Sequence, residues 1–159
     1  MIFTIVKCLH MKKQIIKSFA WDVLKLVIPA FVGFLLAYIT FSKQFDANEK
    51  DRLNGDLNKL LDVNLQYPYV EDSSFIAWWG NHESSNSDSS LRYQAYCEYV
   101  FNFLQNVSEY FKYDKEKITG FVDMGDLVSQ HRGWWNMPEQ RNSESYPSRF
   151  RDFIEKDFK

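Results

Sequence analysis

The stretch from Phe19 to Phe41 constrains this chain most, because it alone is long and apolar enough to cross a lipid bilayer. As a helix, its 23 residues would extend about 34 Å, and the hydrocarbon core of a bilayer is about 30 Å thick. Asp22 and Lys25 lie near its start, where a lysine reaches the headgroups and a carboxylate still reaches water. We therefore predict a transmembrane helix at residues 19–41.

Two alternatives to a transmembrane helix also produce a long apolar stretch: a buried helix of a soluble domain and a cleaved signal peptide. A buried helix of a soluble domain seldom stays apolar for so long. A cleaved signal peptide has a shorter apolar region, followed by an A-x-A-like site, and residues 38–41 (Tyr-Ile-Thr-Phe) offer no such site. We favour an uncleaved anchor over both.

Small residues gather on one face of this stretch. Ala30, Gly33 and Ala37 recur at i, i+3 and i+7, and the pair Gly33 and Ala37 forms a small-xxx-small pattern. Such a face lets a second helix approach closely in lipid. Pro29 is expected to kink the helix just before this face. We predict a helix–helix contact here, with a second copy of the chain or with another membrane protein.

Charge is distributed unequally along the sequence. Before Leu26 there are five Lys and one Asp, a local charge of +4, whereas from Ser42 onward fourteen Lys and Arg face twenty Asp and Glu, a charge of −6. The positive-inside rule therefore places residues 1–18, the basic N-terminal tail, in the cytoplasm, and the C-terminal domain is exported across a bacterial inner membrane. The acidic domain also argues against nucleic acid as a partner, because it lacks a basic surface for phosphates.

Two features oppose or limit this orientation. Lys43, Lys50 and Arg52 follow the span closely and reduce the charge asymmetry. Cys8 and Cys97 lie on opposite sides of the span and cannot pair within one chain, and an unpaired Cys97 suits a reducing cytosol. Met11 is an alternative start to Met1.

The remaining 117 residues or so are enough for one domain, and fourteen Phe, nine Tyr and five Trp in the whole chain supply a core. A leucine stripe at Leu53, Leu57, Leu60 and Leu61 marks a helix that is expected to pack on its own domain rather than dimerise. Helical patterns cover residues 46–66, 91–113, 114–132 and 147–159, with a short helix or turn at 69–80.

No strand alternation is present. The sequence therefore predicts an all-α protein, with one N-terminal transmembrane helix followed by a compact bundle of four to five helices. Residues 42–66 form a juxtamembrane helix that could continue the span, and residues 67–159 form an aromatic-rich helical domain.

Candidate catalytic and metal-binding residues are sparse. His82 and Glu83 are neighbours in a serine-rich loop, and helical rotation places Asp126 and His131 about 140° apart, so we expect solvated polar residues rather than a metal site. Cys97 lies on an apolar helix face, where burial makes a thiol inert. With no glycine-rich phosphate loop, we expect no enzyme and no cofactor.

Two tryptophan pairs stand out, Trp78 with Trp79 and Trp134 with Trp135, the second of them close to Arg132. Adjacent residues of a helix cannot both point inward, so one of each pair could form an exposed aromatic rim for a partner. Alternatively, the pairs close the two ends of the bundle, with Arg132 stacked on a ring. We favour the second interpretation.

Four segments carry a resemblance: 75–79 (FIAWW), 93–104 (YQAYCEYVFNFL), 131–135 (HRGWW) and 146–153 (YPSRFRDF). The region from Leu60 to Lys156 resembles small bacterial proteins of unknown function that have one N-terminal membrane helix and a compact helical domain. The resemblance implies a fold and a membrane location, and no activity.

Together these features predict a membrane-anchored binding or regulatory module whose partners are the bilayer and a membrane protein or a second copy. The alternative is a membrane-acting effector or toxin that works through self-association of its span. An enzyme would need a pocket of convergent titratable groups, which the sequence does not supply.

Overall fold

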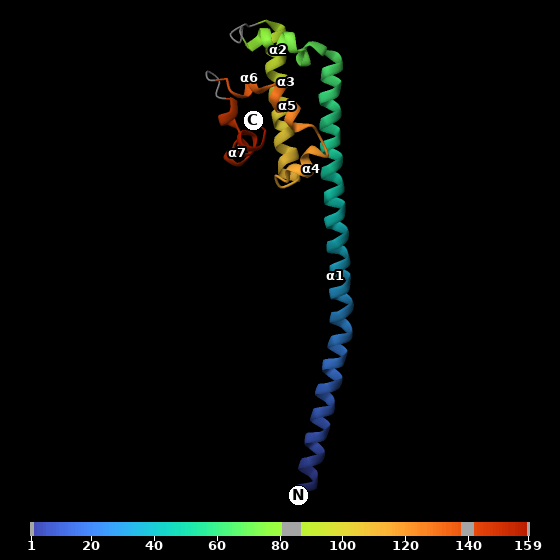
Figure 1. Cartoon of the computed structure of the whole chain (residues 1–159). Coiled ribbons are helices and arrows are strands. Elements are labelled where there is room, and N and C mark those ends of the chain that lie inside the picture. The colour runs from blue at the N-terminus through green and yellow to red at the C-terminus, as the bar shows by residue number, and fades with distance from the viewer. Residues whose placement is uncertain (1, 81–86, 138–141, 159) are drawn as a thin grey trace. The chain divides into compact units, whose positions relative to one another are not determined.

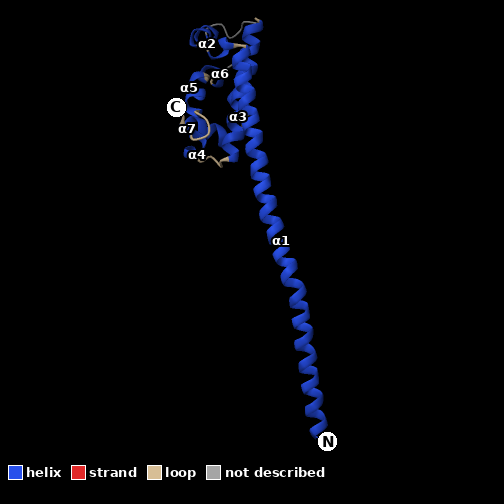
Figure 2. Ribbon diagram, turned by 90° about the vertical axis from the view of Figure 1, so that its right-hand side faces the viewer, coloured by secondary structure: helices blue, strands red, loops and turns tan. Residues whose placement is uncertain are grey.

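The computed structural model describes residues 2–80, 87–137 and 142–158, with side chains from residue 27 onward and at Trp21 and Lys25. Within these residues the chain forms helices and no strand, which confirms the all-α prediction (Figure 1, Figure 2). The elements in chain order are α1 (Ile2–Gln66), η1 (Pro68–Glu71), α2 (Ser73–Gly80), α3 (Asp88–Tyr110), α4 (Lys115–Thr119), α5 (Met124–Gln130), α6 (Arg132–Trp135), η2 (Asn142–Ser145) and α7 (Ser148–Asp157). The chain divides into two compact units, Met1–Asn48 and Glu49–Lys159.

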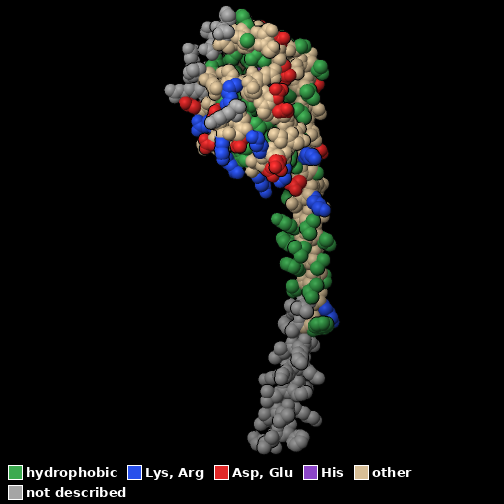
Figure 3. Space-filling view, in the orientation of Figure 1, with side chains coloured by type: hydrophobic (Ala, Val, Ile, Leu, Met, Phe, Trp, Pro, Cys, Tyr) green, Lys and Arg blue, Asp and Glu red, His purple; other side chains and the backbone are tan. Residues whose placement is uncertain are grey.

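The first unit is helical from Ile2 onward and belongs to α1, which passes through Pro29 without ending. The helix contains a stretch long and apolar enough to cross a membrane, and none of that stretch is buried. Large apolar side chains such as Phe31, Phe34 and Phe41 are exposed along it (Figure 3). At the described residues of this stretch, the exposure does not fit the buried core helix that was one alternative for residues 19–41. The side chains of the basic tail at residues 1–18 lie outside the described residues.

The same helix continues through the predicted juxtamembrane segment and ends at Gln66, just before Pro68. Its last five turns belong to the second unit, where Leu53 and Leu60 are buried and Leu57 is partly buried. Leu61 is exposed. The leucine stripe therefore packs onto its own domain at three of its four positions.

Helix α3 is the central element of the second unit. Its N-terminus is capped by Ser87, whose hydroxyl oxygen accepts a hydrogen bond from the Ser90 amide at 3.2 Å. Tyr93, Cys97, Val100 and Leu104 follow the helical 3-and-4 spacing and are fully buried. Figure 1 shows the shorter helices gathered around α3.

The pattern at residues 114–132 predicted one helix, and this prediction is wrong. Asp114 caps α4 by accepting from the Lys117 amide at 3.3 Å, but α4 ends at Thr119. A second cap follows at Asp123, which accepts from the Asp126 amide at 3.0 Å and starts α5. A second side-chain cap offers the backbone an alternative to continuing the first helix, which explains the break.

Helix α7 closes the second unit. Phe150, Phe153 and Ile154 are buried on one face, with Phe158 just after the helix, as the sequence pattern predicted. Pro147 is the residue before the helix rather than its first residue. The helix brings the C-terminal segment against α6, where Arg132 donates to the Phe158 carbonyl oxygen.

Candidate functional site

The exposed side of α3 carries a polar stripe. Gln94, Glu98, Asn102 and Gln105 are spaced by four, four and three residues, so they follow one another along one face of the helix. The opposite face is in the core, which fixes the stripe toward solvent. The stripe is the polar face of an amphipathic helix.

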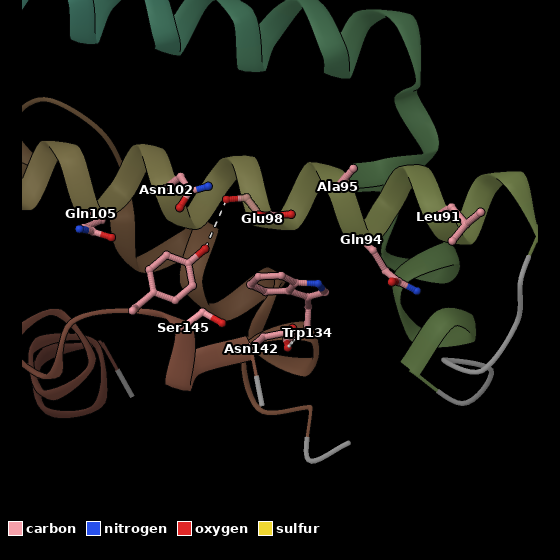
Figure 4. Close-up of a pocket in the computed structure, with 10 residues that line it drawn as sticks. Leu91, Gln94, Ala95, Glu98, Asn102, Gln105, Trp134, Asn142 and Ser145 are labelled. Carbon is pink, nitrogen blue, oxygen red and sulfur yellow. Dashed lines mark hydrogen bonds between the residues drawn. The ribbon is translucent and has the colours of Figure 1, made fainter. Parts of the chain in front are cut away.

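A second wall faces this stripe and comes from the segment around α6 and η2. The Asn142 amide nitrogen donates to the Trp134 carbonyl oxygen at 2.9 Å, which ties η2 to α6. The Tyr146 hydroxyl donates to the Glu98 carbonyl oxygen at 3.4 Å, which joins this wall to α3 (dashed line in Figure 4). Two chain segments about forty residues apart therefore border one groove.

The groove has a volume of about 520 Å³, within the range of ligand sites of roughly 300–1,000 Å³. Figure 4 shows the labelled residues that line it. They are Leu91, Gln94, Ala95, Glu98, Asn102, Gln105, Trp134, Asn142 and Ser145, together with Tyr146.

The chemistry of the lining is amide-rich. Side-chain amides both donate and accept, and the described lining includes four of them, at Gln94, Asn102, Gln105 and Asn142. Gln105 donates to Glu109 at 2.9 Å, whereas Gln94 and Asn102 have no side-chain hydrogen bond among the described residues. Two amides on one wall therefore have hydrogen-bonding capacity that no described residue uses, and they can bind a ligand.

Glu98 is the single charged residue of the described lining. Burial raises the pKa of the Tyr146 hydroxyl, and the neighbouring Glu98 carboxylate raises it further. The hydroxyl therefore stays protonated and donates at neutral pH. Among the described lining residues there is one carboxylate and no cation, which favours a neutral or positively charged ligand.

The predicted aromatic rim is not formed by both tryptophan pairs. Trp134 and Trp135 are 5% and 1% exposed, because the Phe101 ring stacks on both, with centroids 5.4 and 4.6 Å away. Trp79 is also buried and donates to the Ser90 hydroxyl at 2.9 Å. Of the four tryptophans, only Trp78, 40% exposed, offers much surface, so the pairs serve mainly as core.

Arg132 was expected to stack on a ring, and the structure gives it a different partner. Its Nη1 lies 3.0 Å from Glu155 Oε1, and its Nη2 donates to the Phe158 carbonyl. The Trp135 indole donates to the same Glu155 oxygen at 2.8 Å. Arg132 therefore connects α6 to the C-terminal segment and does not line the groove.

His131 corrects a second expectation, because it is fully buried rather than solvated. Its Nδ1 lies 3.0 Å from the Tyr93 hydroxyl and 3.7 Å from Cys97 Sγ. Burial lowers the pKa of His131 to about 4 and raises the pKa of the Cys97 thiol. The pair is thus neutral and enclosed, and Cys97 is a core residue as predicted.

The remaining candidate residues are placed as follows. Ala30, Gly33 and Ala37 are all exposed on α1, and their role in a helix–helix contact stays a prediction. His82 and Glu83 lie outside the described residues. Across the part of the chain that the structure describes, no three His, Cys, Asp or Glu residues are grouped to hold a metal ion.

Comparison of the chain with protein-family models, with curated proteins and with solved structures finds no match.

Proposed function

We propose that this chain is a single-pass membrane protein whose helical domain binds a partner in the groove between α3 and the wall formed by Trp134, Asn142, Ser145 and Tyr146. The observation that supports this most strongly is the groove itself. It is large enough for a ligand, it is held open by two hydrogen-bonded walls, and it displays amides with no partner among the described residues. Unsatisfied directional groups on a rigid helix face are what a binding site needs.

The anchor follows from the exposed apolar stretch of α1. Soluble proteins rarely expose a contiguous apolar surface of this extent, because it associates or aggregates in water. A signal sequence has the same composition and the same position in a chain. We favour an anchor because α1 continues without interruption into the domain, where Leu53 and Leu60 are core residues.

A binding role fits the groove better than catalysis does. The Cys97 thiol lies 3.7 Å from His131 Nδ1, but both residues are buried in the core rather than in the groove. The groove lining itself includes one carboxylate and one tyrosine as its titratable groups. The Tyr146 hydroxyl donates to the Glu98 main-chain carbonyl oxygen rather than to the carboxylate, so the two groups do not form the hydrogen-bonded pair that acid–base catalysis uses.

Anchoring would assist such a module. A domain held at a bilayer meets other membrane proteins at a high effective concentration, so that weak contacts suffice. We place the protein in a bacterial inner membrane, with its N-terminus in the cytoplasm and the domain exported, on the lysine asymmetry around the span.

The test is photo-crosslinking in intact membranes. A photoreactive amino acid replaces Asn102, which faces the groove, and in a matched chain it replaces Ser129, an exposed residue of α5 outside the groove. We expect a discrete crosslinked product from position 102 and none from position 129. Products of equal yield from both positions, or none from position 102, would refute the groove as a binding site.

A further inference from the structure

A smaller cavity lies beside α3, next to the groove. It has a volume of about 220 Å³ and a mostly apolar lining. Its walls come from the end of α1, from η1 and from α3, and the residues are Val63, Tyr67, Val70, Arg92, Ala95, Tyr96 and Tyr99. This volume is below the usual range for a whole small-molecule ligand, so the cavity suits one apolar side chain.

Ala95 lines both cavities. The residues before and after Ala95 line different cavities: Gln94 lines the polar groove and Tyr96 lines the apolar cavity. Ala95 is exposed, and its side chain is a single methyl group, so it is the low point of the ridge that α3 forms between the two cavities. A ligand that crosses α3 can therefore occupy both.

We propose that the two cavities form one surface for an extended polypeptide segment of a partner protein. One apolar side chain of the segment enters the smaller cavity across Ala95, and a lysine or arginine of the segment lies beside Glu98. This inference rests on the proposed function and names the class of ligand.

The spacing of the amides supports a peptide ligand. Four residues of helix rise about 6 Å, so Gln94, Glu98 and Asn102 repeat at about that distance along the groove. An extended chain repeats every two residues, at about 6.6–6.8 Å, and its alternate peptide groups face the same way. Side-chain amides donate and accept, as peptide groups do, so Gln94 and Asn102 can bond peptide groups that lie about 12 Å apart in the segment, and Glu98 between them accepts from its cationic side chain.

Charge supports a basic segment. Glu98 is the charged group of the groove, and the sequence from Ser42 onward has a charge of −6. Arg92 at the edge of the smaller cavity is already engaged, because its Nε lies 2.8 Å from Asp88 and its guanidinium lies 4.6 Å from the Tyr67 ring centroid. An anionic ligand would be repelled by Glu98, and Arg92 is already paired with Asp88. A cationic segment is attracted by the Glu98 carboxylate.

The experiment uses the full chain in non-ionic detergent and an array of random 12-residue peptides as the probe. We expect the bound peptides to be enriched in sequences with Lys or Arg two or three positions from Leu, Ile, Phe or Met. Ala95→Arg should lower binding at least tenfold by filling the ridge, and Glu98→Gln should lower it several-fold and weaken its dependence on salt. Ser129→Arg adds the same side chain on α5 and should leave binding unchanged.

The outcomes separate this inference from the proposed function. If the crosslink at position 102 forms but no peptide binds, the groove is a binding site and the peptide class is wrong. If peptides bind the Ala95→Arg chain as well as the original, the joint surface is wrong. If neither the crosslink nor peptide binding is found, the proposed function fails as well. Helical circular dichroism and melting of each variant show that loss of binding does not come from unfolding.

Discussion

The Tyr93 hydroxyl and His131 Nδ1 lie 3.0 Å apart in the interior of the domain, and both residues are fully buried. His131 Nε2 is also buried and has no hydrogen-bond partner among the described residues. An unpaired buried polar atom costs roughly 1–3 kcal/mol, and a charged imidazole would cost more. The domain therefore folds around a neutral histidine.

This arrangement predicts that acid destabilises the domain. The pKa of His131 is lowered by burial to about 4, from 6.5, so below pH 6.5 the unfolded chain binds a proton that the folded chain does not. The contribution of neutral His131 to the free energy of unfolding is therefore full above pH 6.5 and is lost as the pH falls toward 4. Between pH 7 and pH 5 its loss should lower the free energy of unfolding by about 2 kcal/mol, measured by urea denaturation.

The control for this prediction is His131→Gln, which removes the titrating group and keeps a side chain that can bond Tyr93. The variant should be less stable than the original at pH 7, but its stability should change less between pH 7 and pH 5. Parallel pH profiles for the two chains would show that His131 is not the cause.

The contact between Trp135 and Glu155 predicts unequal effects of two substitutions. Glu155→Ala leaves the buried Trp135 indole N–H without its acceptor at 2.8 Å, which should cost about 1–3 kcal/mol. Glu155→Gln keeps an acceptor and loses the partly exposed ion pair with Arg132, which should cost less than about 1 kcal/mol. Lys156→Ala, exposed on the same helix, should be near neutral. Thermal or urea unfolding measures these changes. Equal losses of unfolding free energy in both Glu155 variants would show that the hydrogen bond from the Trp135 indole is not the main contribution of Glu155.

The sequence predicted the elements that have a strong helical period. Residues 91–113 correspond to α3, and the apolar positions of that pattern are the buried ones, because one face of a long helix must be covered. The end of α1 before Pro68 and the cap at Asp114 were also readable, since proline and aspartate act locally.

What the sequence could not give depends on contacts between distant residues. The polar stripe of α3 was visible as a wet face, but the groove needs a second wall that starts about 30 residues later. Burial of His131 depends on Tyr93, 38 positions away, so periodicity could not distinguish it from a solvated residue. Burial of Trp134 and Trp135 agrees with the core role that the sequence favoured, but the residue that covers both, Phe101, lies about 30 positions earlier and could not be identified from the pattern.

Substitution of Gly33 distinguishes the proposed module from a toxin that acts by self-association. Gly33→Ile places a branched side chain on the small face and should prevent close approach of a second helix in the membrane. A binding module should retain its crosslink at position 102 in this variant. Loss of that crosslink, together with loss of a membrane-damaging activity of the original chain, would favour the effector. Val32→Ile, exposed one position away, is the control.

Orientation is predicted by the lysines before the span. A reporter enzyme that is active only after export, fused after Lys159, should be active, and a reporter active only in the cytosol should be inactive at the same place. Replacing Lys12, Lys13 and Lys17 by Gln should shift the fusion toward the cytosol. A cytosolic domain in the original chain would reverse the assignment and would fit the unpaired Cys97.

The most direct test of membrane anchoring is to extract membranes at alkaline pH and to measure the mass of the chain in the pellet and in the supernatant. We expect the chain to stay in the membrane pellet with residues 19–41 still attached, and to move to the supernatant when Val32→Lys and Leu35→Lys interrupt the apolar stretch. A soluble domain that has lost its first 40 or so residues would show instead that the stretch is a cleaved signal sequence, and would contradict the anchor.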